Sequence, residues 1–107
     1  MENKNIKGVK AFEKGLICRN FQFSENTEFE TTEKIETCVS GFHFCKEEEA
    51  LSVLNYYPPS SEFAEVESFG KTIEFEDKIV TDKIRIGGKL KLGDIVTGKH
   101  KIGRAHV

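Results

Sequence analysis

Three cysteines and the one histidine that lies outside the last eight residues form the set in this chain that best suits metal binding. They are Cys18, Cys38, His43 and Cys45. Three thiolates and an imidazole make a tetrahedral zinc set, and on an extended strand His43 and Cys45 point to the same face. The chain lacks the closely spaced cysteine pairs that usually supply structural zinc sites. The alternative is that the protein holds no zinc or other cofactor and the cysteines pack as small apolar side chains.

Nucleophilic catalysis is a second kind of chemistry that these residues suggest. A thiolate of Cys38 or Cys45 beside His43 would be a nucleophile with its base. However, His43 and Cys45 are too near in sequence to face each other easily. No third group stands out that would orient the histidine, and we therefore name no catalytic residue.

A third arrangement would use NAD. ADP-ribosyltransferases use a histidine, a tyrosine and a glutamate, which here would be His43, Tyr56 or Tyr57, and Glu65 or Glu67. The span from His43 to Glu67 is short for such a nucleotide-binding fold. A small NAD-using transferase remains an alternative, and we expect a binding protein rather than an enzyme.

Charge is divided unevenly along the chain. Residues 1–88 contain 11 Lys and Arg against 17 Asp and Glu, whereas residues 89–107 contain 5 against 1. An acidic body can bind a basic partner protein, and exposed tyrosines are frequent anchors of such contacts. The residues expected to contact a partner are Tyr56, Tyr57, Glu47, Glu48, Glu74 and Glu76. The alternative for the two tyrosines is packing at the end of a helix.

The basic tail offers a different function, the binding of nucleic acid through phosphate contacts. Its cationic residues are Lys89, Lys91, Lys99, Lys101 and Arg104. No Phe, Tyr or Trp occurs in residues 76–107 to stack on bases, which weakens the case for single-strand binding.

Most of these residues must be positioned by strands. Alternation of apolar and polar residues predicts strands at 6–12, 16–23, 27–31, 35–39, 42–45, 62–69, 72–76, 79–80 and 83–86. We expect the first two to form a hairpin, and the two that flank Gly70 to form another. Because successive side chains of a strand point to opposite faces, we expect Phe42 and Phe44 to lie on the face opposite Cys45.

One helix interrupts the strands. Residues 46–56 have helical spacing of apolar residues and begin with a run of glutamates, which suits the positive end of a helix dipole. The prolines at 58 and 59 end it. The sequence thus predicts an α+β fold: a mostly antiparallel sheet with one short helix packed on it.

The two ends of the chain differ from this body. Residues 1–5 are polar and expected to be disordered, which leaves 6–87 as the α+β domain. Glycines at positions 88, 93, 98 and 103 divide residues 88–107 into five-residue units. They predict a glycine-punctuated β tail, as a repeated β-arc or a hairpin, and a homodimer through this tail is a partner hypothesis.

Length and hydropathy set the remaining bounds. A chain of 107 residues suits one domain with a single core. No apolar run approaches the roughly 18 residues of a membrane-spanning helix, and the N-terminus has no apolar segment typical of a signal peptide. We therefore expect a cytoplasmic protein.

Several motifs occur in the order typical of one family. They are Lys7–Phe12, Cys18–Phe23, Cys38–Cys45, Asn55–Pro59, Ala64–Val66 and Val80–Ile84. The chain resembles a domain of unknown function found in phage and prophage proteins, over about residues 6–86. Gly-Phe-His-x-Cys at 41–45 and Tyr-Tyr-Pro-Pro at 56–59 are its most specific motifs. Glycine-punctuated repeats often follow that domain.

The resemblance implies a mobile-element origin and an infected bacterial host. Short phage proteins often antagonise host defence, so by association we expect a protein-binding module that inhibits a defence nuclease or its RNA complex, as anti-CRISPR proteins do. Nucleic-acid binding by the tail and NAD-dependent transfer are the alternatives.

Overall fold

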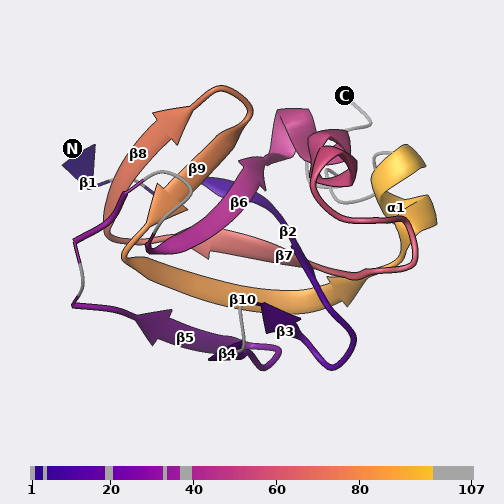
Figure 1. Cartoon of the computed structure of the whole chain (residues 1–107), viewed down its shortest axis with the longest axis horizontal. Coiled ribbons are helices and arrows are strands. Elements are labelled where there is room, and N and C mark those ends of the chain that lie inside the picture. Colours follow the sequence, from indigo (N-terminus) through magenta and orange to yellow (C-terminus); the bar gives the residue numbers. More distant parts are fainter. Residues whose placement is uncertain (1, 4, 19–20, 33, 37–39, 98–107) are drawn as a thin grey trace.

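An antiparallel sheet of eight strands is the main element of the fold, and its strand order is β1-β8-β9-β6-β2-β7-β10-β5 (Figure 1). The computed structural model describes residues 2–3, 5–18, 21–32, 34–36 and 40–97. The strands of this sheet are β1 (Glu2–Asn3), β2 (Lys7–Phe12), β5 (Thr27–Glu30), β6 (Phe42–Lys46), β7 (Glu62–Ser68), β8 (Lys71–Phe75), β9 (Lys78–Thr81) and β10 (Lys83–Leu90). The remaining elements are β3 (Ile17–Cys18) and β4 (Phe21–Gln22), which pair with each other, a 3₁₀ helix η1 (Glu47–Asn55) and an α-helix α1 (Leu92–Thr97).

The sheet divides in the middle, between β2 and β6. These strands pair at Gly8–Lys46 and Val9–Cys45, whereas β2 pairs with β7 along all six of its residues. β6 meanwhile pairs with β9 from Phe42 onward. Beyond the Val9–Cys45 pair the halves β1-β8-β9-β6 and β2-β7-β10-β5 therefore separate.

The chain crosses between the two halves at neighbouring points. It passes through Gly70 from β7 to β8, and through Asp82 from β9 back to β10. The Asp82 carboxylate accepts the Lys71 N–H at 2.9 Å, and the Thr81 hydroxyl donates to the Lys71 carbonyl at 2.7 Å. A Cβ at Gly70 would collide with Asp82 and Lys83. Glycine thus allows the two crossings to lie side by side.

Both predicted hairpins differ from the structure. β7 pairs with β2 and β10, and β8 pairs with β1 and β9, so the hairpin predicted across Gly70 is wrong. The first predicted hairpin is reduced to a bridge between Glu13 and Ile17, after which β3 pairs with β4. A glycine turn signal does not distinguish a hairpin from a crossing between two half-sheets.

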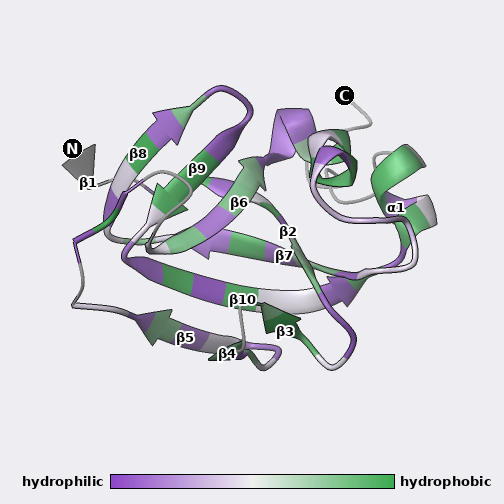
Figure 2. Cartoon of the chain, viewed as in Figure 1, coloured by the Kyte–Doolittle hydropathy of each residue, from purple (hydrophilic) through white to green (hydrophobic). Residues whose placement is uncertain are grey.

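Apolar residues pack on both faces of the sheet, and Figure 2 shows hydrophilic and hydrophobic residues alternating along much of β10. One cluster contains Phe12, Leu16, Cys18, Phe23, Phe44, Ala64, Val66, Ile79, Ile84 and Ile86. The other lies under the two helices and contains Val9, Ala11, Cys45, Ala50, Val53, Phe63 and Ile95. Phe42 packs on the first cluster with Phe44, and Cys45 belongs to the second, so the predicted division of β6 is confirmed.

A mostly antiparallel sheet with a short helix, as predicted, is what the described residues form. The helix is less regular than expected, because η1 is a 3₁₀ helix and the backbone at Glu49 (φ −118°, ψ 29°) is not helical. No helix in the described ranges is long and apolar enough to cross a membrane.

The predicted β tail differs where the structure describes it. β10 continues to Leu90, but residues 92–97 form α1 rather than a further strand. The Asp94 carboxylate accepts the Lys91 N–H at 3.0 Å, as in half of a capping box, and Ile95 is buried at 2% exposure. One capping bond and one buried apolar contact thus override the five-residue glycine period. Residues 98–107 lie outside the described part of the chain.

The short ladder between β2 and β6 can be tested at Gly8. The change Gly8→Ala should lower the free energy of unfolding by about 1–3 kcal/mol, because a Cβ there would collide with the Cys45 carbonyl oxygen and the Phe44 ring. Denaturant unfolding measures the loss. Gly88→Ala in β10 is the matched control, since nothing lies within 4 Å of its added Cβ, and it should change stability by less than about 0.5 kcal/mol. Equal losses would mean that β2 and β6 are not in such close contact.

Candidate functional site

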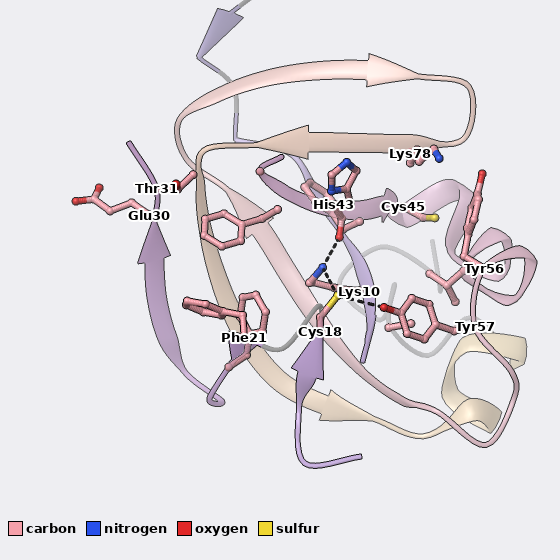
Figure 3. A pocket seen from close by; sticks show the side chains of 16 residues that line it. Lys10, Cys18, Phe21, Glu30, Thr31, His43, Cys45, Tyr56, Tyr57 and Lys78 are labelled. Carbon is pink, nitrogen blue, oxygen red and sulfur yellow. Dashed lines mark hydrogen bonds between the residues drawn. The ribbon is translucent and has the colours of Figure 1, made fainter. Parts of the chain in front are cut away.

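A cavity of about 470 Å³ lies where β2 and β6 separate (Figure 3). Its wall includes Lys10 of β2, His43 of β6, and Tyr56 and Tyr57 at the end of η1. Tyr56 is 47% exposed, so the cavity opens to solvent on that side. Ligand-binding pockets in proteins typically have volumes of about 300–1,000 Å³, and this one is within that range.

Lys10 is the buried charge of the cavity, with an exposed fraction of 4%. Its Nζ donates to the His43 carbonyl at 2.8 Å and lies 3.7 Å from the Cys18 Sγ. The bond to His43 joins the two half-sheets at the level where the β2–β6 ladder has ended. Burying an ammonium group is costly unless polar partners replace water, and this geometry supplies them.

Aromatic rings surround the Lys10 ammonium. Its Nζ is 5.6 Å from the centre of the Phe12 ring and 5.5 Å from that of Phe23, within the range of cation–π attraction. Phe21 and Phe42 extend this wall, with their ring centres 6.2 Å apart. The lining thus combines one buried cation with several ring faces and edges.

A polar chain continues from Lys10 to η1. The Cys18 Sγ is 3.1 Å from the Tyr57 hydroxyl, and in Figure 3 dashed lines connect Lys10 to Cys18 and Cys18 to Tyr57. Tyr57 is half-buried and packs against both apolar clusters. Of the two predicted partner-binding tyrosines, Tyr57 therefore faces the cavity and Tyr56 is the more exposed one.

Sequence reasoning missed Lys10. The signal was present, because a lysine occupies the middle of the otherwise apolar run Val9–Phe12, on the same strand face as the buried Phe12. A charge in such a position is rare unless a specific partner or site retains it.

The predicted metal ligands are only partly brought together. Cys18, His43 and Cys45 all line the cavity, but Cys18 and Cys45 belong to the apolar clusters of opposite sheet faces. Cys38 lies outside the described residues. Within the described ranges, no three His, Cys, Asp or Glu residues are grouped so that they could hold a metal ion.

Cys45 is poorly suited to be a nucleophile. Its pKa is raised to about 12, mainly by burial and further by the negative charges of Asp77 and Glu49. A thiol with such a pKa is almost entirely protonated near neutral pH, and the thiolate is the reactive form.

The residues proposed for an NAD-using transferase are separated by the fold. His43, Tyr56 and Tyr57 share the cavity, whereas Glu67 on β7 accepts hydrogen bonds from Arg85 and Asn5. Glu65 is exposed on β7 and, like Glu67, does not line the cavity. Asp77, which was not part of this predicted set, instead accepts a hydrogen bond from the cavity residue Tyr56.

Asp77 ties the β8–β9 turn to η1. It accepts a hydrogen bond from the Tyr56 hydroxyl at 2.6 Å and another from the Asn55 amide at 3.2 Å. The bond from Tyr56 is the main reason that the pKa of Asp77 is lowered and that of Tyr56 raised. The Lys78 ammonium lies 4.6 Å from the centre of the Tyr56 ring.

The four glutamates predicted to contact a partner come from two segments, which the Tyr56–Asp77 hydrogen bond connects. Glu47 and Glu48 begin η1, and Glu74 and Glu76 lie at the end of β8 and in the turn after it. Lys46 lies between the segments: its Nζ is 3.2 Å from Glu74 and 3.9 Å from Glu49. The hydrogen bond to Glu74 is the main cause of the raised pKa of Lys46.

Two of the five basic residues predicted to bind nucleic acid, Lys89 and Lys91, lie in the part of the chain that the structure describes. Lys89 lies on β10, with its Nζ 3.6 Å from the Glu62 carboxylate, and Lys91 precedes α1. Lys99, Lys101 and Arg104 lie outside the described residues.

Comparison with protein families identifies the chain. The model of the domain of unknown function DUF7666 matches residues 6–98, and the chain therefore belongs to this family. Searches of curated proteins and of solved structures found no match.

The raised pKa of Cys45 predicts slow alkylation. At about pH 8, iodoacetamide should modify Cys45 in the folded chain about a thousandfold more slowly than in the chain unfolded by guanidinium chloride, because its pKa is about 12 rather than 9.0. Mass spectrometry of the Cys45 peptide measures both rates. Similar rates in the two states would show that Cys45 is an accessible, reactive thiol.

The Tyr56–Asp77 hydrogen bond predicts a shift that NMR can measure. In Tyr56→Phe the pKa of Asp77 should rise, because the hydroxyl that stabilises its charged form is lost. Since folding lowers this pKa, the contribution of Asp77 to stability is present above its ordinary value of 3.8 and lost as the pH falls through the folded value. Tyr57→Phe is the control, because the Tyr57 hydroxyl contacts Cys18 instead. An unchanged Asp77 titration in Tyr56→Phe would contradict the assignment.

Proposed function

We propose that this member of the DUF7666 family is a protein-binding module, and that it contacts its partner through an acidic face made by η1 and the end of the β8–β9 hairpin. We define the acidic face as Glu47, Glu48, Tyr56, Glu74 and Glu76. The observation that carries the proposal is the exposed Tyr56, held by Asp77 among carboxylates of two segments distant in sequence.

The rigidity of Tyr56 favours its use as an anchor. Its hydroxyl is bonded to Asp77 at 2.6 Å and its ring lies beside the Lys78 ammonium, yet 47% of the residue remains exposed. Phe75, the strand partner of Lys78, is 46% exposed. Aromatic side chains that are held in place before binding lose little entropy on association and dominate many interfaces.

The charges around these rings indicate the kind of partner. Carboxylates at the rim attract a basic surface, increase the rate of encounter and exclude acidic competitors. A nuclease groove that binds nucleic acid is basic, and an acidic face can compete for it. The proposed partner is therefore a host defence nuclease or its RNA complex, bound in the cytoplasm of an infected bacterium by a phage or prophage protein with an anti-CRISPR-like role.

The test begins with affinity capture from a lysate of a bacterial host, after which the captured protein is purified and its affinity measured. Tyr56→Ala should weaken binding about tenfold or more. The double change Glu74→Lys with Glu76→Lys should weaken it and reduce its dependence on salt. Both variants should fold, with a small decrease in the thermal midpoint from loss of the Tyr56–Asp77 and Lys46–Glu74 contacts, because these residues are exposed.

A matched double variant tests the position of the charges. Glu13→Lys with Glu36→Lys makes the same change in net charge at exposed positions on other segments. It should bind like the parent chain. If the two double variants lose affinity equally, net charge rather than the acidic face is responsible, and the proposed surface is wrong.

One observation supports a second proposal, an NAD-using transferase. His43, Tyr56 and Tyr57 line one cavity, and Asp77 rather than Glu65 or Glu67 is bonded to a member of that set. Release of nicotinamide from NAD by the purified chain, lost in His43→Ala, would support it. No release above the uncatalysed rate rejects it.

A further inference from the structure

We propose that the cavity between β2 and β6 binds a small, uncharged, planar aromatic molecule, whose ring packs against the phenylalanines of the cavity wall. This inference does not depend on the acidic face, because it concerns a cavity rather than a protein contact surface. It begins from Phe21, which lines the cavity and is nevertheless 45% exposed.

Three phenylalanines of the wall form one cluster. The ring centres are 4.7 Å apart for Phe21–Phe23, 5.8 Å for Phe23–Phe42 and 6.2 Å for Phe21–Phe42. The ring planes of these pairs meet at 60–77°, so each contact is of the edge-to-face kind that favours aromatic pairs. The rings therefore hold one another in place before any ligand binds, which lowers the entropy lost on binding.

The members of this cluster differ in burial. Phe23 is 3% exposed and belongs to an apolar core cluster, Phe42 packs against that cluster and is half-buried, and Phe21 lies at the margin. A ligand that covered Phe21 would remove apolar surface from water, whatever its shape. An aromatic ligand would add a ring–ring contact that an aliphatic one cannot make. The cluster thus favours aromatic over aliphatic ligands.

The polar side of the wall is bonded within the protein. The Lys10 Nζ donates to the His43 carbonyl at 2.8 Å and lies 3.7 Å from the Cys18 Sγ, which is 3.1 Å from the Tyr57 hydroxyl. A charged ligand would lose its hydration on entering the cavity, and this loss is costly. An uncharged ring avoids that cost and leaves the bonds of the polar side intact.

The size of the cavity suits a molecule of one or two rings. Its volume of about 470 Å³ is within the range of small-molecule sites. In the view of Figure 3, Phe21 lies on one side of Lys10 and the tyrosines Tyr56 and Tyr57 lie on the other. Two probes isolate the effect of aromaticity: 2-naphthol and decahydro-2-naphthol share one carbon skeleton and a hydroxyl, but only the first has aromatic rings.

Calorimetric titration of the full chain with each probe is the experiment. The chain should bind 2-naphthol about three- to tenfold more tightly than decahydro-2-naphthol. Phe21→Leu, which keeps most of the apolar volume and removes the ring, should weaken 2-naphthol binding about threefold or more and leave decahydro-2-naphthol binding within about twofold. Phe75→Leu is the matched control and should keep the preference, since Phe75 is 46% exposed and does not line the cavity.

A second measurement needs no variant. In the parent chain, nuclear Overhauser contacts should connect the ring protons of bound 2-naphthol with those of Phe21 and Phe42. The proposal is overturned if 2-naphthol does not bind, if the two probes bind equally, or if Phe75→Leu loses the preference as Phe21→Leu does. Overhauser contacts only to rings outside the cavity would also overturn it.

Discussion

The hydrogen bond from the Lys10 ammonium to the His43 carbonyl connects the two halves of the sheet at the point where their strand ladder ends. An ordinary antiparallel pair would continue with backbone bonds and close the space between the strands. Here a side chain from β2 reaches the carbonyl of β6 instead. The two half-sheets stay in place, and the space between them becomes a cavity with a cation in its wall.

Two glycine positions make this division feasible. At Gly8 the backbones of β2 and β6 approach so closely that a Cβ would collide with the Cys45 carbonyl. At Gly70 the chain leaves one half of the sheet beside the point where Asp82 returns to it, and the bonds from Asp82 and Thr81 to Lys71 hold the two crossings together. Close contact at these positions allows the strands to separate elsewhere without loss of the fold.

Two consecutive tyrosines line the cavity, and one of them also belongs to the acidic face. Tyr57 turns inward and contacts Cys18 beside Lys10, whereas Tyr56 remains exposed and bonds Asp77 in the turn between β8 and β9. Both follow η1, a helix of 3₁₀ type that is irregular at Glu49. The cavity and the acidic face therefore share one structural element, η1 and the two tyrosines that follow it.

Much of the fold was determined by the sequence through local rules. Alternation along residues 42–45 predicted that Phe42 and Phe44 would lie opposite Cys45, and a run of glutamates followed by prolines predicted the helix after it. These features depend on neighbours a few residues apart, which period-two and helical spacing describe well. The glycine period of the tail was a weaker guide, because a cap at Asp94 and the burial of Ile95 form a helix there.

The site itself was decided by tertiary structure. Lys10, Cys18 and Tyr57 come from three separate elements, and Asp77 meets Tyr56 across 21 residues of chain. Which strands pair across Gly70, and where β2 leaves β6, depends on contacts between segments that no local pattern connects. Alternation tells which side of a strand a residue faces, but only the pairing of distant strands decides whether that side meets a neighbour or a cavity.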